Sequence, residues 1–317
     1  MSKVLYCKNN PVYNIDTEQI YNENLLPGYM LMHGANKYTF KIWLKLRYSS
    51  NTNTLARQLK GVAFGQGNRI SINNETHALS LSDCYWIKDD TIQLVFESVS
   101  PYHAEFWKGI GEYTSGQSIP TLYVGGYLRK EWINRSTLLK YGQETQIEYE
   151  ATNICKLCNI RSVNIQLTPN GIAVENITNI NLMLEQADQS GRLDPDDFDE
   201  DTIENLFGID GIRMLIIDAI IGNGDRHAGN FGWLRSTDTG KYICMAPLYD
   251  FDHALDSKSE SDRIITDAAR VIKAKREYII EAQNIARKIV STQGVRDIFK
   301  LRANTLYNNI SKHMTTF

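Results

Sequence analysis

A carboxylate, an amide and a second carboxylate lie close together in the second half of the chain. Asp225 begins the segment DRHAGN, Asn230 ends it, and Asp250 follows twenty residues later in the segment YDFD. Phosphoryl transfer uses this set of groups. One carboxylate accepts the proton of the attacking hydroxyl, while the amide oxygen and the other carboxylate hold magnesium on the nucleotide's phosphates. The spacing therefore predicts an ATP-dependent kinase, with Asp225 as the base and with Asn230 and Asp250 as metal ligands.

Each of these three residues also has a structural interpretation. Asp225 alone could be an Asx-turn residue that closes a loop flanked by glycines. Asp250 follows Pro247 and Tyr249 and could be another turn carboxylate, although the end of a predicted strand favours a side chain that points into a cleft. Magnesium prefers a few hard oxygen ligands together with phosphate oxygens, and Asn230 and Asp250 would supply them. The three residues together favour the catalytic interpretation.

The assignments of the neighbouring loop residues are open. His227 either touches the transferred phosphate, as a catalytic residue, or holds backbone carbonyls of the loop in place. Arg226 is expected to pair with a carboxylate, for which Asp218 and Asp252 are the candidates. Asp252 and His253 follow the second carboxylate closely, so we expect them to support the metal ligands from behind.

A lysine on a predicted strand is placed to meet the nucleotide. The β-rich segment STLLK ends at Lys140, immediately before a predicted helix. A lysine there neutralises the α- and β-phosphates and is held by an acid on that helix. Glu148 and Glu150 are the candidates, and they face different ways because they are two residues apart. We favour Glu148, which adjoins Ile147 at the start of the helix's apolar stripe. The alternative for Lys140 is a surface lysine on an edge strand.

Two adjacent glycines precede this strand. Gly125 and Gly126 would let backbone amides approach phosphate, as glycine loops do, but such a pair also marks any tight turn. Their place in the predicted order of elements favours the nucleotide-binding interpretation. That order is strand 120–123, glycine turn, strand 136–140, helix 144–157, hairpin 163–177, helix 211–221, strand 242–245 and two or three amphipathic helices over 264–315. Earlier in the chain, residues 38–47 are expected to be helical, and residues 79–87 to form either the start of a helix or a turn that enters a strand.

Composition narrows the class of protein. The chain has 317 residues, 42% of them hydrophobic, and 34 Lys and Arg against 37 Asp and Glu, which is typical of a globular protein without dedicated nucleic-acid binding. No segment approaches the ~20 apolar residues of a membrane span, and the N-terminus lacks the apolar core of a signal peptide, so we expect a cytoplasmic protein. The five cysteines are expected to be free thiols, and the CxxC pair Cys155 and Cys158 to lie on a structural helix.

The quoted motifs resemble those of the HipA-like kinases, bacterial and phage-encoded serine/threonine kinases related in fold to protein and phosphoinositide kinases. The match covers roughly residues 119–315, and its strongest block, IIDAIIGNGDRHAGNFG (216–232), resembles the family's catalytic loop. APLYD (246–250) resembles the metal-binding segment, and STLLK resembles the nucleotide-binding strand. The segment 148–160 resembles the helix with the partner acid, and 124–132 resembles a glycine loop found in some members.

The resemblance implies ATP, Mg2+ and transfer of the γ-phosphate to a Ser/Thr hydroxyl of a protein substrate, with autophosphorylation as a further expectation. It implies an α+β, bilobal, protein-kinase-like fold. We expect an N-terminal accessory region over 1–115, a small β-rich N-lobe over 116–180 and a mostly helical C-lobe over 181–317. An antitoxin-like or regulatory protein partner is a separate implication of the resemblance.

The sequence departs from the family's pattern in two places, and other classes compete. Phe251 and Asp252 follow Asp250 where kinase metal loops have a glycine, and the first 110 residues match the common N-terminal subdomain poorly. One alternative is a lipid or small-molecule kinase, because phosphoinositide kinases share the Asp-Arg-His-x-x-Asn pattern. A second is a non-catalytic pseudokinase or docking module. A third is a metal-dependent hydrolase, whose signal would be a two-metal cluster with histidine ligands.

Overall fold

The computed structural model describes residues 2–47, 77–103, 128–193, 199–255 and 258–311. The chain divides into two compact units that interleave along the sequence. Unit 1 contains Met1–Tyr141, Ala173–Arg192 and Gly232–Ala246, and unit 2 contains Gly142–Ile172, Leu193–Phe231 and Pro247–Phe317. The predicted boundaries after residues 115 and 180 stay a prediction. Secondary structure is mixed, with helices and antiparallel sheets, so the α+β class is confirmed.

The N-terminal part of unit 1 is built on a three-stranded antiparallel sheet with the order β2-β1-β3. Trp43, Trp86 and Phe96 are fully buried in its core, where Trp86 lies 6.1 Å from Phe96 between ring centroids. Large aromatic side chains therefore close this core. The predicted helix over 38–47 is confirmed as α2, and the strand predicted after residue 79 is β3. The elements are β1 (Lys3–Cys7), β2 (Asn10–Asn14), η1 (Glu23–Leu25), α1 (Gly28–His33), α2 (Lys37–Arg47), β3 (Tyr85–Asp89) and α4 (Phe96–Val99).

A second antiparallel sheet of unit 1 has the order β10-β9-β8 and consists of β8 (Leu182–Gln186), β9 (Gly232–Ser236) and β10 (Tyr242–Met245). The short helix η3 (Ala187–Gln189) follows β8. Strand β9 begins at a glycine because the neighbouring strand is too close for a side chain: a Cβ on Gly232 would lie 2.2 Å from the carbonyl oxygen of Glu185. The strand predicted over 242–245 is confirmed as β10.

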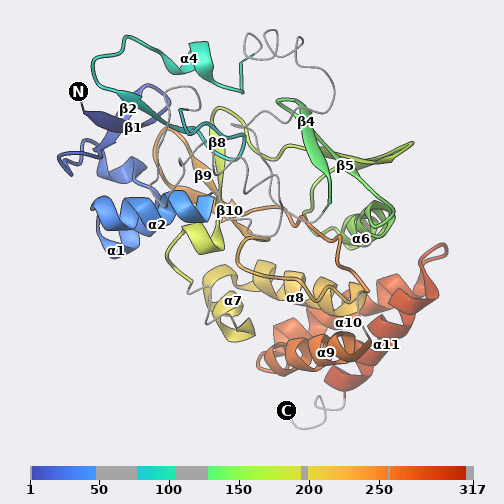
Figure 1. Ribbon diagram of the computed structural model, residues 1–317. Coiled ribbons are helices and arrows are strands. Elements are labelled where there is room, and N and C mark those ends of the chain that lie inside the picture. Colours follow the sequence, from blue (N-terminus) through green and yellow to red (C-terminus); the bar gives the residue numbers. More distant parts are fainter. Residues whose placement is uncertain (1, 48–76, 104–127, 194–198, 256–257, 312–317) are drawn as a thin grey trace. The chain divides into compact units, whose positions relative to one another are not determined.

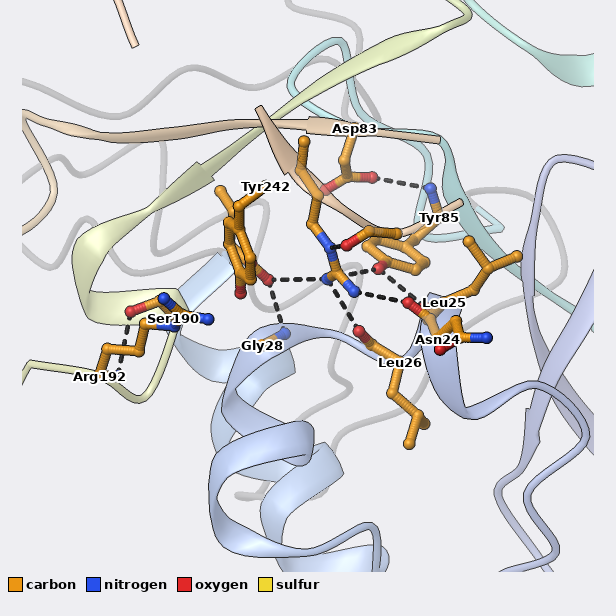
Figure 2. A network of polar contacts seen from close by, with 12 residues as sticks. Asn24, Leu25, Leu26, Gly28, Asp83, Tyr85, Ser190, Arg192 and Tyr242 are labelled. Atoms are coloured by element: carbon orange, nitrogen blue, oxygen red, sulfur yellow. Dashed lines mark hydrogen bonds and ion pairs between the residues drawn. The ribbon is translucent and has the colours of Figure 1, made fainter. Parts of the chain in front are cut away.

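A network of polar contacts joins this second sheet to the N-terminal residues of unit 1, and Figure 2 shows Tyr242 of the sheet together with Asn24, Leu26 and Gly28. A fully buried arginine of the sheet belongs to this network. Arg235 on β9 donates to the carbonyl oxygens of Leu26 and Asn24, each at 2.8 Å, and lies 3.4 Å from the Glu185 carboxylate. Glu185 in turn accepts hydrogen bonds from the backbone N–H of Gly28, at 2.6 Å, and from the Tyr242 hydroxyl. A buried guanidinium is tolerated only when its donors find acceptors. The backbone carbonyls of Asn24 and Leu26 are two of these acceptors, and Glu185 supplies the opposite charge.

The predicted lysine strand is confirmed as β5 (Thr137–Tyr141) in a four-stranded sheet with the order β4-β5-β7-β6. Its hairpin partner is β4 (Lys130–Asn134), with Lys130 opposite Lys140, whereas the expected strand 120–123 lies outside the described residues. At the turn between β4 and β5, the Asn134 side-chain oxygen accepts from the backbone N–H of Ser136 at 2.8 Å. The predicted hairpin over 163–177 contains β6 (Ile165–Thr168) and β7 (Gly171–Glu175).

Unit 2 is mostly helical, and α8 lies against α9, α10 and α11 (Figure 1). Almost every residue of α8 from Gly211 onward is buried, because the helix is apolar around its whole circumference. Among the described helices, none is long and apolar enough to cross a membrane. The helices are α6 (Thr145–Leu157), α7 (Glu200–Phe207), α8 (Ile209–Ile221), α9 (Lys258–Ile272), α10 (Arg276–Ser291) and α11 (Asp297–Ser311).

Three further expectations concern unit 2. The amphipathic pattern over 264–315 forms helices that include α10 and α11, and the α8 pattern begins two residues earlier than predicted. Cys155 and Cys158 are free thiols, Cys155 being buried within α6 and Cys158 directly following it, as expected of a structural helix. In the acidic segment, Asp199 caps α7 by accepting from the backbone N–H of Thr202 at 2.7 Å.

Candidate active site

The segment with the predicted base begins where α8 ends. Gly222 adopts a left-handed conformation (φ 67°) that only glycine reaches without strain, and it terminates the helix. The backbone N–H groups of Gly222 and Asn223 both donate to the carbonyl of Asp218, so the chain turns sharply out of the helix. The side-chain amide of Asn223 also donates to the Asp218 carboxylate at 2.9 Å. This turn sets the direction in which Asp225 leaves the helix.

A buried ion pair fixes the loop to the helix. The Arg226 guanidinium forms two hydrogen bonds of 2.9 Å with the Asp218 carboxylate, so the structure selects Asp218 over Asp252 as its partner. Burial lowers the pKa of Arg226, but the charge and the hydrogen bonds of Asp218, together with the charges of Tyr249 and Asp250, raise it, and the net pKa is raised. The same guanidinium donates to the carbonyls of Asn230, at 2.7 Å, and Tyr249, at 3.0 Å. Arg226 therefore joins α8, the loop and the segment before the second carboxylate.

The predicted base and the predicted amide ligand are in direct contact. Asn230 is buried and donates its side-chain N–H to the backbone carbonyl of Asp225 at 2.9 Å. Within the described part of the chain, no donor hydrogen-bonds to the side-chain oxygen of Asn230. This oxygen is therefore available to a cation, in an orientation set by the bond to Asp225.

Two imidazoles flank the Asp225 carboxylate, whose side chain is 47% exposed. The Nε2 atoms of His227 and His253 lie 3.8 Å and 3.9 Å from Asp225 Oδ2. The backbone N–H of Gly229 donates to His227 Nδ1 at 3.1 Å, so a neutral His227 has its proton on Nε2, the nitrogen that faces Asp225. His253 therefore also lies near the predicted base, and the expectation that it supports the metal ligands stays a prediction.

The second carboxylate is placed by a short, well-anchored segment. Leu248 donates its N–H to Arg161 and accepts from Val163, at 2.9 and 3.0 Å, while the Tyr249 hydroxyl donates to the carbonyl of Gly229 at 3.1 Å. Asp250 then adopts a left-handed backbone (φ 60°), a conformation uncommon outside glycine and enriched at functional sites.

The phenyl ring of Phe251 is fully buried, with the Arg226 guanidinium 5.2 Å from its centroid. The residue that directly follows Asp250 therefore packs against the guanidinium that joins the two segments.

The predicted nucleotide-binding lysine and its acid are both buried. Lys140 on β5 is 5% exposed, which contradicts the alternative of a surface lysine. Glu148 on α6 is 0% exposed, whereas Glu150 forms an ion pair with Arg296. Glu150 is engaged by Arg296, whereas Glu148 is enclosed like Lys140, so Glu148 remains the favoured acid. Gly125 and Gly126 lie outside the described residues.

The donor set fits a magnesium ion. The Asn230 amide oxygen and the Asp250 carboxylate are hard oxygen ligands of the kind that magnesium takes beside phosphate oxygens. The competing metal hydrolase needs a cluster of side-chain ligands, and the described ranges contain no group of three or more His, Cys, Asp and Glu arranged to hold a metal. Sequence reasoning missed Asn223, whose signal is its position between two glycines at the end of a predicted helix.

The fold is similar to that of solved structures. No protein-family model and no curated protein matches the sequence. Among solved structures, the chain is similar to HipA of Shewanella oneidensis MR-1, from the toxin–antitoxin complex of HipA, HipB and operator DNA. The TM-score is 0.51 and the identity 11%, covering 98% of this chain and 97% of HipA. The chain therefore shares the α+β fold of HipA. The proinflammatory kinase CtkA of Helicobacter pylori also aligns, with a TM-score of 0.37 and 17% identity over 59% of this chain and 92% of CtkA.

Proposed function

We propose that this chain is an ATP-dependent kinase that transfers the γ-phosphate to a Ser or Thr hydroxyl of a protein. The observation that carries the proposal is the contact between Asn230 and Asp225. It ties the backbone of Asp225, whose carboxylate is half-exposed, to the side chain of Asn230, whose amide oxygen is left for a cation. The HipA-like fold supports the same class, because it extends over nearly the whole chain.

Each site residue has a role in this proposal. Asp225 accepts the proton of the attacking hydroxyl, and His227, whose Nε2 faces Asp225, contacts the transferred phosphate. Asn230 and Asp250 hold magnesium, which when bound neutralises charge on the phosphate oxygens. Arg226 takes no part in the reaction and keeps the loop and the Asp250 segment in register through its bonds to both.

The nucleotide's phosphates require groups from elsewhere in the chain. Lys140 neutralises the α- and β-phosphates and Glu148 holds it, while Gly125 and Gly126 bring backbone amides to the phosphates. The proposal assigns nucleotide binding to the β-rich lobe and the catalytic loop to the helical lobe of a bilobal kinase. It therefore requires Lys140 and Asp250 to contact the same triphosphate.

The proposed substrate is a protein hydroxyl, and autophosphorylation is one form of the same reaction. A regulatory or antitoxin-like protein partner is part of the proposal, and dedicated nucleic-acid or membrane binding is not. The lipid or small-molecule kinase is the second candidate, since the Asp-Arg-His-x-x-Asn arrangement serves such substrates equally well. A pseudokinase is disfavoured because Lys140, Asp225, Asn230 and Asp250 are all present.

The test is transfer of labelled phosphate from ATP with magnesium, scored on the chain itself, on added protein and on lipid. Asp225→Asn and Asp250→Asn are each expected to lower transfer on the order of 10²-fold or more, because a general base or a metal ligand is lost. Asp238→Asn is the matched control, since among the described residues this exposed carboxylate forms its ion pair with Lys8 alone. Transfer that is unchanged in both folded site variants contradicts the assignment, and label on lipid alone favours the second candidate.

A further inference from the structure

A buried arginine of the last helix reaches the end of α8. Arg302 on α11 is 6% exposed. Its guanidinium donates to the carbonyl oxygens of Ala219, at 2.5 Å, and Ile220, at 3.1 Å. Carbonyls in the last turn of a helix have no partner within the helix. Here the N–H of Asn223, which would otherwise reach Ala219, donates to Asp218 instead. Arg302 thus donates to the carbonyls of Ala219 and Ile220 in place of the backbone N–H groups that turn away at the end of α8.

The same guanidinium lies against the turn that leads to Asp225. A Cβ on Gly222 would lie 3.3 Å from the Arg302 guanidinium carbon, so the two groups are in close contact. Gly222 also accepts a hydrogen bond from the N–H of Leu255 at 2.9 Å, and Asn223 forms a β-bridge with Ala254. Arg302 therefore contacts a turn, Gly222 and Asn223, that is hydrogen-bonded to the segment following Asp250.

Charge strengthens this arrangement. The C-terminal end of a helix carries a partial negative charge, which a cation stabilises most where water is excluded. Two buried guanidiniums meet the end of α8: Arg226 binds the Asp218 carboxylate, and Arg302 binds the backbone carbonyls of the next two residues. Because arginine presents several donors in a rigid fork, one side chain can hold both carbonyls at once, which the single amine of a lysine does less well.

We propose that Arg302 is a positioning residue for the phosphoryl transfer: it holds the last turn of α8 in the geometry that presents Asp225 and the segment after Asp250 to the substrate. The inference rests on the proposed function for its kinetic consequence only. With this role of Arg302, helix α11 supports catalysis, although no residue of that helix is assigned to the nucleotide or the substrate. A side-chain misplacement of ~1 Å costs on the order of 10²-fold in rate, so a small shift of this turn is enough to be measured.

The test compares Arg302→Lys and Arg302→Gln with Arg287→Gln, an exposed arginine of α10 whose partner is the Tyr307 hydroxyl. In both Arg302 variants, kcat is expected to fall about 10-fold or more while KM for ATP stays within about 2-fold, because geometry at Asp225 is lost and nucleotide contacts are kept. The backbone amides of Gly222, Asn223 and Leu255 are expected to exchange hydrogen about 10-fold faster, since their hydrogen bonds open more readily. The control changes neither quantity.

Each failure is recognisable. A folded Arg302→Lys chain with wild-type kcat and wild-type exchange at the turn overturns the proposal. If the unaltered chain transfers no phosphate, the proposed function fails, and hydrogen exchange alone then decides whether Arg302 positions the turn. If both Arg302 variants unfold, the substitution Gly222→Ala is used instead. Its added Cβ would press on the Arg302 guanidinium and so disturb the same contact. A folded Gly222→Ala chain with unchanged kcat and unchanged exchange overturns the proposal equally.

Discussion

The side-chain amide of Asn230 donates to the backbone carbonyl of Asp225 at 2.9 Å. This hydrogen bond joins the main chain of Asp225 to the side chain of Asn230, five residues later in the sequence. The bond uses the nitrogen of Asn230 and leaves its oxygen for a cation. It also holds the backbone that carries the predicted base. One contact therefore couples the proton acceptor to the metal ligand.

The substitution Asn230→Asp tests the bond to Asp225 separately from the binding of a cation. The variant keeps an oxygen ligand but places a carboxylate against the Asp225 carbonyl, so the loop is expected to shift although a cation can still bind. We expect kcat to fall about 10²-fold, with less than about 10-fold change in the magnesium concentration for half-maximal activity. A magnesium titration of phosphate transfer measures both. An unchanged kcat would show that the bond to Asp225 has no catalytic role.

Asp218→Ala removes one partner of the buried pair and leaves the Arg226 guanidinium without its carboxylate. Breaking a buried pair in this way costs about 3–5 kcal/mol, so the free energy of unfolding should fall by that amount. The control is Asp210→Ala, because Asp210 is exposed and its pairs with Arg161 and Arg213 are expected to contribute at most about 1 kcal/mol. Urea unfolding compares the two, and equal losses would contradict the role assigned to Asp218.

Arg235→Met tests the network that joins the N-terminal residues to β8 and β9. The change keeps an apolar stem but strips the carbonyls of Asn24 and Leu26 of their donor and leaves Glu185 buried without its cation. Unfolding free energy should fall by about 3 kcal/mol or more. Arg263→Met serves as the control, since the Arg263 side chain is 84% exposed and forms an ion pair with Asp267 one helical turn away. A loss below about 1 kcal/mol in the Arg235 variant would mean that the network does not hold these parts together.

Asp188 on η3 predicts a pH dependence of stability. Burial raises the pKa of its carboxyl to about 7, with backbone hydrogen bonds opposing the shift, and its Oδ1 has no partner among the described residues. Because the folded state binds this proton more tightly than the unfolded chain, the stabilisation from protonation is complete below the unfolded pKa near 4. It is lost as pH rises through about 7.

Asp188→Asn, which stays neutral, should therefore be more stable than the unaltered chain at pH 8. The gain should reach a few kcal/mol, from about 1.4 kcal/mol per pKa unit, and should shrink toward pH 4. Thermal unfolding across that range measures the difference. A gain that is the same at pH 4 and pH 8 would contradict the assignment.

Local patterns in the sequence carry more information about the candidate site than about the fold around it. The Asp225 loop, Asn230 and Asp250 occupy one stretch of sequence, so their spacing alone indicated the chemistry, and the glycines after Ile221 marked the end of α8. Arg302 follows Asp225 by 77 residues with no motif of its own, and nothing in sequence marks an arginine whose acceptors are backbone carbonyls. Its role depends on tertiary packing.

The N-terminal sheet was missed for a similar reason. Strand β1 pairs with β3, placing Leu5 opposite Ile87 across a long separation in sequence, and neither β1 nor β2 is long enough to give a clear alternating pattern. The bonds from Arg235 to Asn24 and Leu26 span more than 200 residues. Pairings of this kind are set by the folded core and leave little local trace.

The central claim is that Lys140, Asn230 and Asp250 act on one nucleotide. A crystal structure of the chain with magnesium and a non-hydrolysable ATP analogue measures this most directly. We expect oxygen atoms of Asn230 and Asp250 about 2.1 Å from a magnesium ion that is bound to the phosphates, and the Lys140 amine in contact with the α- and β-phosphates. A bound nucleotide that touches neither Lys140 nor Asp250 would contradict it.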